Sequence, residues 1–142
     1  MQTIVKRGLA ALIDAYGYTE AADMALLQYA AVAYRAGNYD KALELYDAAW
    51  NEFKNNTQFN HLILSGLAYT HAAKNDPEKA ISYFQQVVAD ENAILKDQAL
   101  FHLGLLLDET GEPEKSADAY NRIVSDHPQS VYAEIAKAKL AG

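Results

Sequence analysis

The sequence lacks cysteine altogether and contains only three prolines and seven glycines among its 142 residues. The absence of cysteine excludes disulfides, thiolate metal sites and cysteine nucleophiles. The scarcity of proline and glycine argues against low-complexity disorder. No apolar run reaches the roughly 18–20 residues that a membrane-spanning helix needs, so we expect no direct membrane insertion by this chain. Asp14 and Glu20 also follow the first apolar residues too closely for a signal peptide.

Positive charge is scarce as well. The 12 Lys and Arg residues are outnumbered by 19 Asp and Glu residues, and the formal net charge is −7. An acidic chain without a basic stripe repels phosphate backbones, so we expect no nucleic-acid partner. We interpret the few clustered cations as solvated helix faces; they are Lys6 with Arg7, and Lys137 with Lys139.

Helix-forming residues dominate the rest of the composition. Alanine, leucine and tyrosine are abundant, and β-branched residues are scattered with no run longer than three, which favours helix over strand. We predict an all-α single domain over residues 1–142, because this length suffices for one hydrophobic core. Its expected parts are an N-terminal helix at 3–16, helix pairs at 21–54, 58–91 and 94–128, and a capping helix at 130–140.

Turn residues separate the two helices of each expected pair. They form the sequences Gly37-Asn38, Asn75-Asp76-Pro77 and Gly111-Glu112-Pro113. Asn38 and Asp76 suit the N-cap of the second helix, since a short side-chain oxygen can accept a free backbone N–H there. We expect Thr57 to cap the first helix of the middle pair in the same way. Proline at the first helical position loses no helical hydrogen bond.

The three helix pairs share one pattern of small and large residues, with copies 38 and then 36 residues apart. A small residue lets two helices approach closely, and an aromatic one a turn further along fills the space between them. In the second helices Ala42, Ala80 and Ser116 correspond, then Tyr46, Phe84 and Tyr120, then Ala49, Val87 and Ile123; in the first helices Leu26, Leu64 and Leu100 correspond, then Tyr29, Leu67 and Leu103, then Ala30, Ala68 and Gly104.

This pattern resembles the tetratricopeptide repeat, a helix pair of about 34 residues with a small-residue and aromatic signature. The departures from the family pattern are Asn75 in place of a turn glycine, Trp50 outside the usual tryptophan position, and the longer spacing. The resemblance implies a superhelical solenoid of three antiparallel helix pairs with an extra N-terminal helix and a C-terminal cap. An ordinary helical bundle with coincidental spacing is the alternative. The best match is the third copy, with Leu103-Gly104, Gly111, Ser116, Tyr120, Ile123 and Pro128.

A second resemblance concerns the C-terminal run from Tyr120 to Leu140. It is similar to repeat endings in bacterial cell-envelope members of the family, such as the ancillary translocon subunit, the outer-membrane assembly lipoprotein and the Tol–Pal-associated protein. This likeness implies a periplasmic or membrane-anchored envelope domain rather than a cytoplasmic one. Membrane-anchored members carry their anchor ahead of the repeats, so such a segment would precede this sequence.

No constellation of residues for catalysis, metal binding or cofactor binding stands out. Two histidine ligands on one helix need a spacing of three or four residues, and no pair here has it. The paired acidic residues flank an exposed turn, whereas general acid–base catalysis needs carboxylates that converge in a cleft. We therefore expect no enzyme, no metal and no cofactor. The residues considered are His61, His71, His102 and His127, with Asp108-Glu109 and Glu112-Glu114.

The family resemblance implies that the first helix of each pair lines a concave groove that binds peptides or helices. Some relatives bind a partner's carboxylates there, but the matching positions here supply no reliable positive charge. The groove is instead apolar and aromatic with an acidic edge, and exposed apolar patches mark interfaces. The predicted partner-binding residues are Leu27, Tyr34, Arg35, Leu62, Tyr69, Phe101, Leu105, Asp108 and Glu109.

These residues predict a non-catalytic protein–protein interaction module, a scaffold or chaperone-like subunit. Its expected partner is an apolar peptide or helix, with basic flanking residues suited to the acidic edge. Two alternatives remain open. The N-terminal helix can pack into the groove through Ile4, Leu9, Leu12 and Ile13, or the chain can form a homo-oligomer through that helix or through the groove.

Overall fold

The computed structural model describes residues 4–17 and 19–142, without the side chains of residues 4–6, 9 and 13. These residues form eight α-helices and no strand, which confirms the all-α prediction. The helices are α1 (Ile4–Tyr16), α2 (Glu20–Arg35), α3 (Tyr39–Phe53), α4 (Asn60–Ala73), α5 (Pro77–Ala89), α6 (Lys96–Glu109), α7 (Pro113–Asp126) and α8 (Val131–Ala141).

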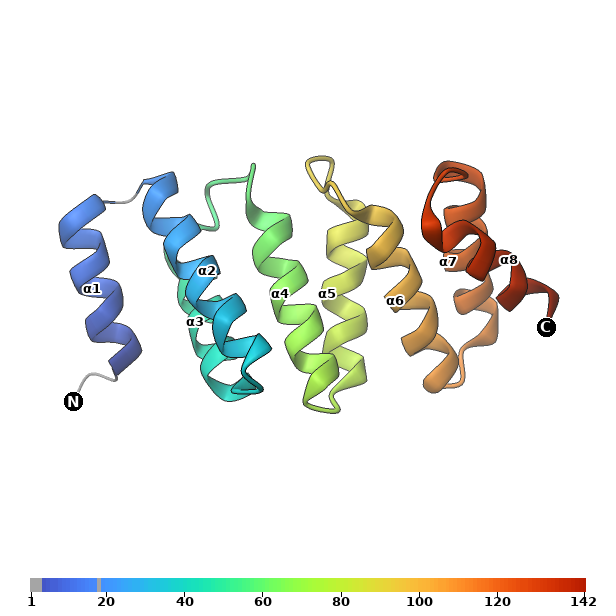
Figure 1. Cartoon of the computed structure of the whole chain (residues 1–142), viewed down its shortest axis with the longest axis horizontal. Coiled ribbons are helices and arrows are strands. Elements are labelled where there is room, and N and C mark those ends of the chain that lie inside the picture. Colours follow the sequence, from blue (N-terminus) through green and yellow to red (C-terminus); the bar gives the residue numbers. More distant parts are fainter. Residues whose placement is uncertain (1–3, 18) are drawn as a thin grey trace.

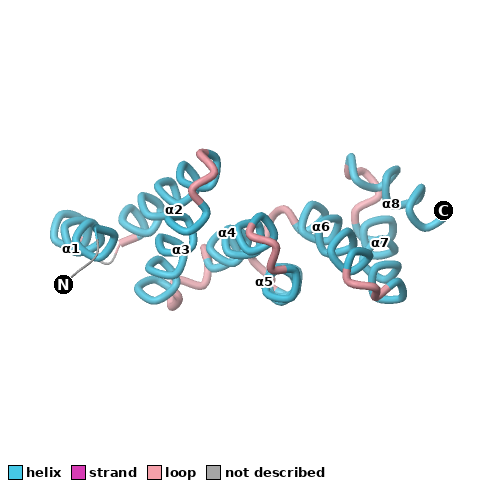
Figure 2. Tube along the Cα trace, turned by 90° about the horizontal axis from the view of Figure 1, so that it is seen from below, coloured by secondary structure: helices cyan, strands magenta, loops and turns pink. Residues whose placement is uncertain are grey.

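The helices stand side by side in a row, with the two ends of the chain at opposite ends of the row (Figure 1). Seen along the other direction, α2, α4, α6 and α8 form one layer and α3, α5 and α7 form a second layer (Figure 2). Each pair α2–α3, α4–α5 and α6–α7 is one antiparallel unit, and successive units stack along the row. The arrangement is a helical solenoid, as predicted.

Short polar caps and left-handed turn residues produce the tight turns within the pairs. The side chains of Asn38 and Asp76 accept hydrogen bonds from the backbone N–H groups of Lys41 and Lys79, as predicted. Asn75 adopts a positive φ of 59° at the turn where the family pattern has glycine. Asparagine tolerates this left-handed conformation better than other non-glycine residues.

The predicted cap at Thr57 is wrong, because α4 begins later in the chain. Its N-cap residue is Phe59, which makes no side-chain capping bond. The connection between α3 and α4 is instead tied to its surroundings by side-chain amides. Asn60 donates to the carbonyl of Lys54, and Asn92 donates across to the carbonyl of Thr57.

The repeated small and aromatic positions form the core. Ala42, Ala80 and Ser116 are at most 1% exposed, so the helices of each pair meet there at short range. An ideal Cβ built on Gly104 would lie only 2.5 Å from Cε1 of Tyr120. Glycine is therefore required at this position by the ring packed against it.

Tyr29 departs from the pattern of its counterparts. Leu67 and Leu103 are at most 6% exposed, whereas Tyr29 is 61% exposed. The helix that precedes α2 is α1, and it stands apart from α2 and α3 and leaves an apolar cavity of about 560 Å³ between them. Tyr29 lines this cavity together with Leu12 and Val32.

The C-terminal helix α8 closes the other end of the row. Ala133 and Ala136 are buried against the repeats, and Tyr132 stacks on Phe101 of α6 with ring centroids 4.8 Å apart. Ser130, the N-cap of α8, donates a hydrogen bond of 2.6 Å to Asp97. These contacts fix α8 in the layer that contains α2, α4 and α6.

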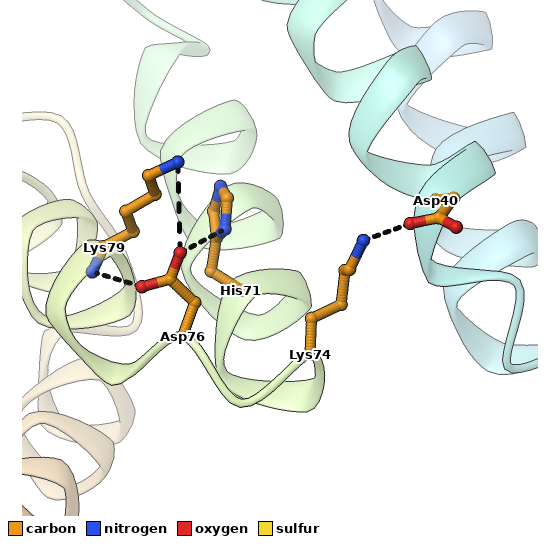
Figure 3. Close-up of polar contacts among 5 residues, drawn as sticks. All are labelled: Asp40, His71, Lys74, Asp76 and Lys79. Atoms are coloured by element: carbon orange, nitrogen blue, oxygen red, sulfur yellow. Dashed lines mark hydrogen bonds and ion pairs between the residues drawn. The ribbon is translucent and has the colours of Figure 1, made fainter.

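Ion pairs lie at the ends of the helices, and one of them links neighbouring units on the surface. Lys74, at the end of α4, pairs with Asp40 at the start of α3 (Figure 3). In the same turn, between α4 and α5, Asp76 lies 3.8 Å from the Nδ1 atom of His71 and 3.9 Å from the Nζ atom of Lys79. Exposed pairs of this kind contribute little to stability, about 0–1 kcal/mol each.

Candidate binding groove

Two adjoining hollows lie along the layer of α2, α4 and α6. We call them the first hollow, of about 530 Å³, and the second hollow, of about 520 Å³. They share Ala31, Arg35 and Leu62, so together they form one groove. The first is lined by Met24, Leu27, Gln28, Ala31, Val32, Arg35, Tyr46 and Leu62, and the second by Ala31, Arg35, His61, Leu62, Ser65, Tyr69, Val87, Ala93, Ile94, Leu95, Gln98 and Ala99.

Four of the residues proposed from the sequence meet in this groove. Leu27, Arg35 and Leu62 line the first hollow. Arg35, Leu62 and Tyr69 line the second. They meet because the first helices of the pairs lie in one layer, so that residues at corresponding turns of α2 and α4 face the same side.

Three other proposed residues lie outside both hollows. The ring of Tyr34 packs on Tyr39 with centroids 5.5 Å apart. Phe101 packs against the core and stacks on Tyr132, and Leu105 is half-buried further along α6. The capping helix thus covers part of the ring that the sequence suggested for partner contact.

The acidic edge consists of two residues with different surroundings. Both carboxylate oxygens of Asp108 accept hydrogen bonds from α7, one from the hydroxyl of Ser116 at 2.6 Å and one from the hydroxyl of Tyr120 at 2.9 Å. Burial raises the pKa of Tyr120 to about 12, and the bond to Asp108 adds to the rise. Both acidic residues are exposed, but Asp108 holds α6 to α7 through these two hydrogen bonds.

Tyr69 belongs to an aromatic cluster as well as to the groove. Its ring meets Phe84 and His102 edge to face, each with centroids 5.0 Å apart. Burial raises the pKa of Tyr69 and lowers the pKa of His102, because each loses water around its charged form. Replacing Tyr69 by alanine would remove core contacts as well as groove contacts, whereas replacing Phe101, which lies outside both hollows, would remove core contacts.

The sequence reasoning missed the residues that enclose the second hollow. These are Val87 near the end of α5, the segment 93–95 that connects α5 to α6, and His61 in the first turn of α4. Ile94 and Leu95 are 71% and 60% exposed. Ile94 and Leu95 could have been noticed in the sequence, because they are two adjacent apolar residues in a connection and follow no helical stripe.

Among the side chains that the structure describes, two buried polar ones make no hydrogen bond. His61 is 7% exposed, and neither of its ring nitrogens has a partner. Asp23 is fully buried in the first turn of α2 with both carboxylate oxygens unpaired, and burial raises its pKa to about 6. In the part of the chain that the structure describes, no three His, Asp or Glu side chains gather as metal ligands. Across the same residues, no helix is long and apolar enough to cross a membrane.

The fold and the groove define a helical-repeat protein whose repeated pairs present one face of their first helices. Two family models, both described as tetratricopeptide repeat, match residues 20–90 and residues 65–131. The chain belongs to the tetratricopeptide-repeat family. No curated protein matches it. Tetratricopeptide repeats generally mediate protein–protein interactions, so the chain is an interaction module.

Proposed function

We propose that the chain binds an apolar peptide or helix in the groove lined by α2, α4 and α6. The observation that carries this proposal is the pair of adjoining hollows with Leu27, Leu62 and Tyr69 in their walls. Open apolar hollows with a few polar groups are the usual form of a binding site. Arg35 lines both hollows, so a peptide bound in the groove meets a positive charge there, whereas Glu109 at the end of α6 lines neither hollow.

The experiment uses peptides selected from a random displayed library on the folded chain. Their dissociation constants are then measured for the native chain and for two variants with the same substitution. Ser65→Glu places a charge in the wall of the second hollow, and Ser82→Glu places one on the exposed surface of α5. We expect selected peptides rich in apolar residues, at least tenfold weaker binding for Ser65→Glu, and an unchanged constant for Ser82→Glu. Peptides that bind Ser65→Glu as tightly as the native chain would refute the groove.

We also propose a scaffold or chaperone-like role in a bacterial envelope complex, periplasmic or membrane-anchored. Its support is the likeness of the run from Tyr120 to Leu140 to repeat endings of envelope members of the family. Fractionation of the source cells, followed by detection of the protein with an antibody, tests it. Recovery solely from the cytoplasm would contradict it.

Self-association is the second candidate, and the cavity beside α1 favours it. Tyr16, Tyr29 and Val32 line this apolar cavity and are each more than half exposed. Burying such a patch against a second copy would remove apolar surface from water. Light scattering across a concentration series should then show a dimer, and Val32→Glu should return it to a monomer. A monomer at every concentration excludes this candidate.

A further inference from the structure

Arg35 supplies the positive charge of the groove. Among the described residues it is the one Lys, Arg, Asp or Glu that lines either hollow, and it lines both. Arg35 is exposed at the last turn of α2, and no carboxylate of the described residues pairs with it. Burial raises the pKa of Tyr46, and the charge of Arg35 offsets part of this rise, so the charge acts on the wall of the first hollow. The groove is thus locally positive in a chain with a net charge of −7.

Arg35 lies where the two hollows adjoin, so a peptide that fills both hollows covers it. Water then leaves the guanidinium, and a charge that loses its water without gaining a partner costs free energy. A guanidinium has N–H donors and no acceptor, and a carboxylate can accept two of them at once in a charge-assisted pair. Neutral amide and carbonyl oxygens form weaker hydrogen bonds with it. A peptide with a carboxylate at this point therefore binds more tightly than a neutral one.

We propose that the groove selects a peptide in which an aspartate or glutamate side chain pairs with Arg35 and apolar residues on either side occupy the two hollows. This inference rests on the proposed function. The carboxylate belongs to a side chain, because a peptide that ended at Arg35 would leave one hollow empty. The basic flanking residues expected from the sequence belong opposite Asp108 and Glu109, and these two residues line neither hollow. The charge that the groove itself requires of its partner has the opposite sign.

The test uses the probe N-acetyl-Leu-Ala-Glu-Ala-Leu-amide and its versions with a central glutamine or lysine. Alternate residues of an extended peptide point to the same side, so both leucines and the central residue can face the groove. Each probe is titrated into the ¹⁵N-labelled full chain while the backbone amide shifts are followed. We expect shifts at Ala31, Leu62 and Ser65, the glutamate probe about fivefold tighter than the glutamine probe, and the lysine probe weakest. Equal affinities, no binding, or shifts elsewhere in the chain would overturn the proposal.

Two features of the probes exclude other sources of the preference. The net charge of −7 repels the glutamate probe as a whole, so tighter binding of this probe must arise locally. A fourth probe, the glutamine version with a free C-terminal carboxylate, should bind no more tightly than its amide. Tighter binding of this fourth probe would show that Arg35 binds a chain end, which would overturn the assignment to a side chain.

Three variants at exposed positions assign the preference to Arg35. Arg35→Gln removes the charge, so the affinity ratio of the glutamate and glutamine probes should fall to about one. Arg35→Glu reverses the charge and should make the lysine probe the tightest of the three. Arg122→Glu, the matched control on α7 outside both hollows, changes the net charge equally and should leave the native order unchanged. A glutamate preference that survives Arg35→Gln, or that Arg122→Glu abolishes, overturns the assignment.

The outcome is separable from that of the proposed function. Library peptides that bind the native chain and fail on Ser65→Glu, together with probes that show no glutamate preference, would overturn the pairing with Arg35 and leave the peptide groove in place. A glutamate preference that depends on Arg35, without any selected peptide, would overturn the peptide groove and leave a carboxylate site at Arg35.

Discussion

Replacing Asp23 by asparagine should stabilise the protein at neutral pH. The carboxylate is fully buried and unpaired, and burial raises its pKa from 3.8 to about 6. Each pKa unit corresponds to about 1.4 kcal/mol, so ionised Asp23 costs up to about 3 kcal/mol above pH 6. The favourable position of a carboxylate at a helix N-terminus offsets part of the gain from removing it, by about 0.3–1 kcal/mol. We therefore expect Asp23→Asn to gain about 1–2 kcal/mol at pH 7.5.

The pH dependence follows from the direction of the shift. Between pH 3.8 and about 6 the folded form keeps the Asp23 proton and the unfolded form has lost it. Stability from this group is therefore present in full below pH 3.8 and is lost as the pH rises through 6. Asparagine has no proton to lose, so the free-energy difference between Asp23→Asn and the native chain should stay nearly constant from pH 7.5 to about 6 and then shrink as the pH falls to 4.

The assay is urea unfolding followed by circular dichroism at several pH values, for the native chain and for Asp23→Asn. Taking the difference cancels the other titrating groups, such as His102, whose pKa is lowered by burial. The control is Asp118→Asn, an exposed carboxylate on α7, which should change stability by less than about 0.5 kcal/mol at every pH. A difference for Asp23→Asn that does not change with pH would refute the reasoning.

Two further substitutions test contacts between helices. Gly104→Ala should destabilise the fold by about 1–2 kcal/mol in urea unfolding, because the new methyl group clashes with the ring of Tyr120 and this cost outweighs the gain in helix propensity. The control is Gly8→Ala, where a Cβ meets nothing within 4 Å, and it should be neutral or stabilising. Equal effects of the two would contradict the role of the ring. Asp108→Ala should cost about 1–3 kcal/mol, because it leaves two α7 hydroxyls without their acceptor, and a change below about 0.3 kcal/mol would show that the bonds contribute nothing.

The fold was predictable because every helix pair has the same packing requirement. A small residue and an aromatic residue one turn apart, such as Ala80 and Phe84, indicate the buried face of a helix pair, and this inference needs no knowledge of the elements outside that pair. Both are at most 1% exposed in the structure. Tyr29 shows the limit of this reasoning. Its burial depends on the helix that precedes it, and α1 stands too far from α2 to cover it.

The groove was less predictable, because its residues are brought together by connections as well as by helices. Leu62 and Tyr69 lie on the helical stripe of α4 and could be proposed from the pattern. Ile94 and Leu95 precede α6 and follow no period, so only the path of the chain brings them to the second hollow. Asp108 illustrates the opposite case. Its position in the sequence predicts a groove residue, but in the structure its hydrogen bonds hold α6 to α7.

One repeat position illustrates why function must be argued copy by copy. Asp23, His61 and Asp97 lie 38 and 36 residues apart in the first turns of α2, α4 and α6. Burial alone would raise the pKa of Asp97, but hydrogen bonds from Ser130 and from backbone N–H groups together have the larger effect and lower this pKa below its usual value. The chain itself therefore stabilises Asp97 as an anion. Asp23 has no partner and lines neither hollow, so its effect falls on stability. His61 also has no partner, and although it lines the second hollow its ring nitrogens are closed off from solvent, so its unpaired nitrogens too reduce the stability of the fold.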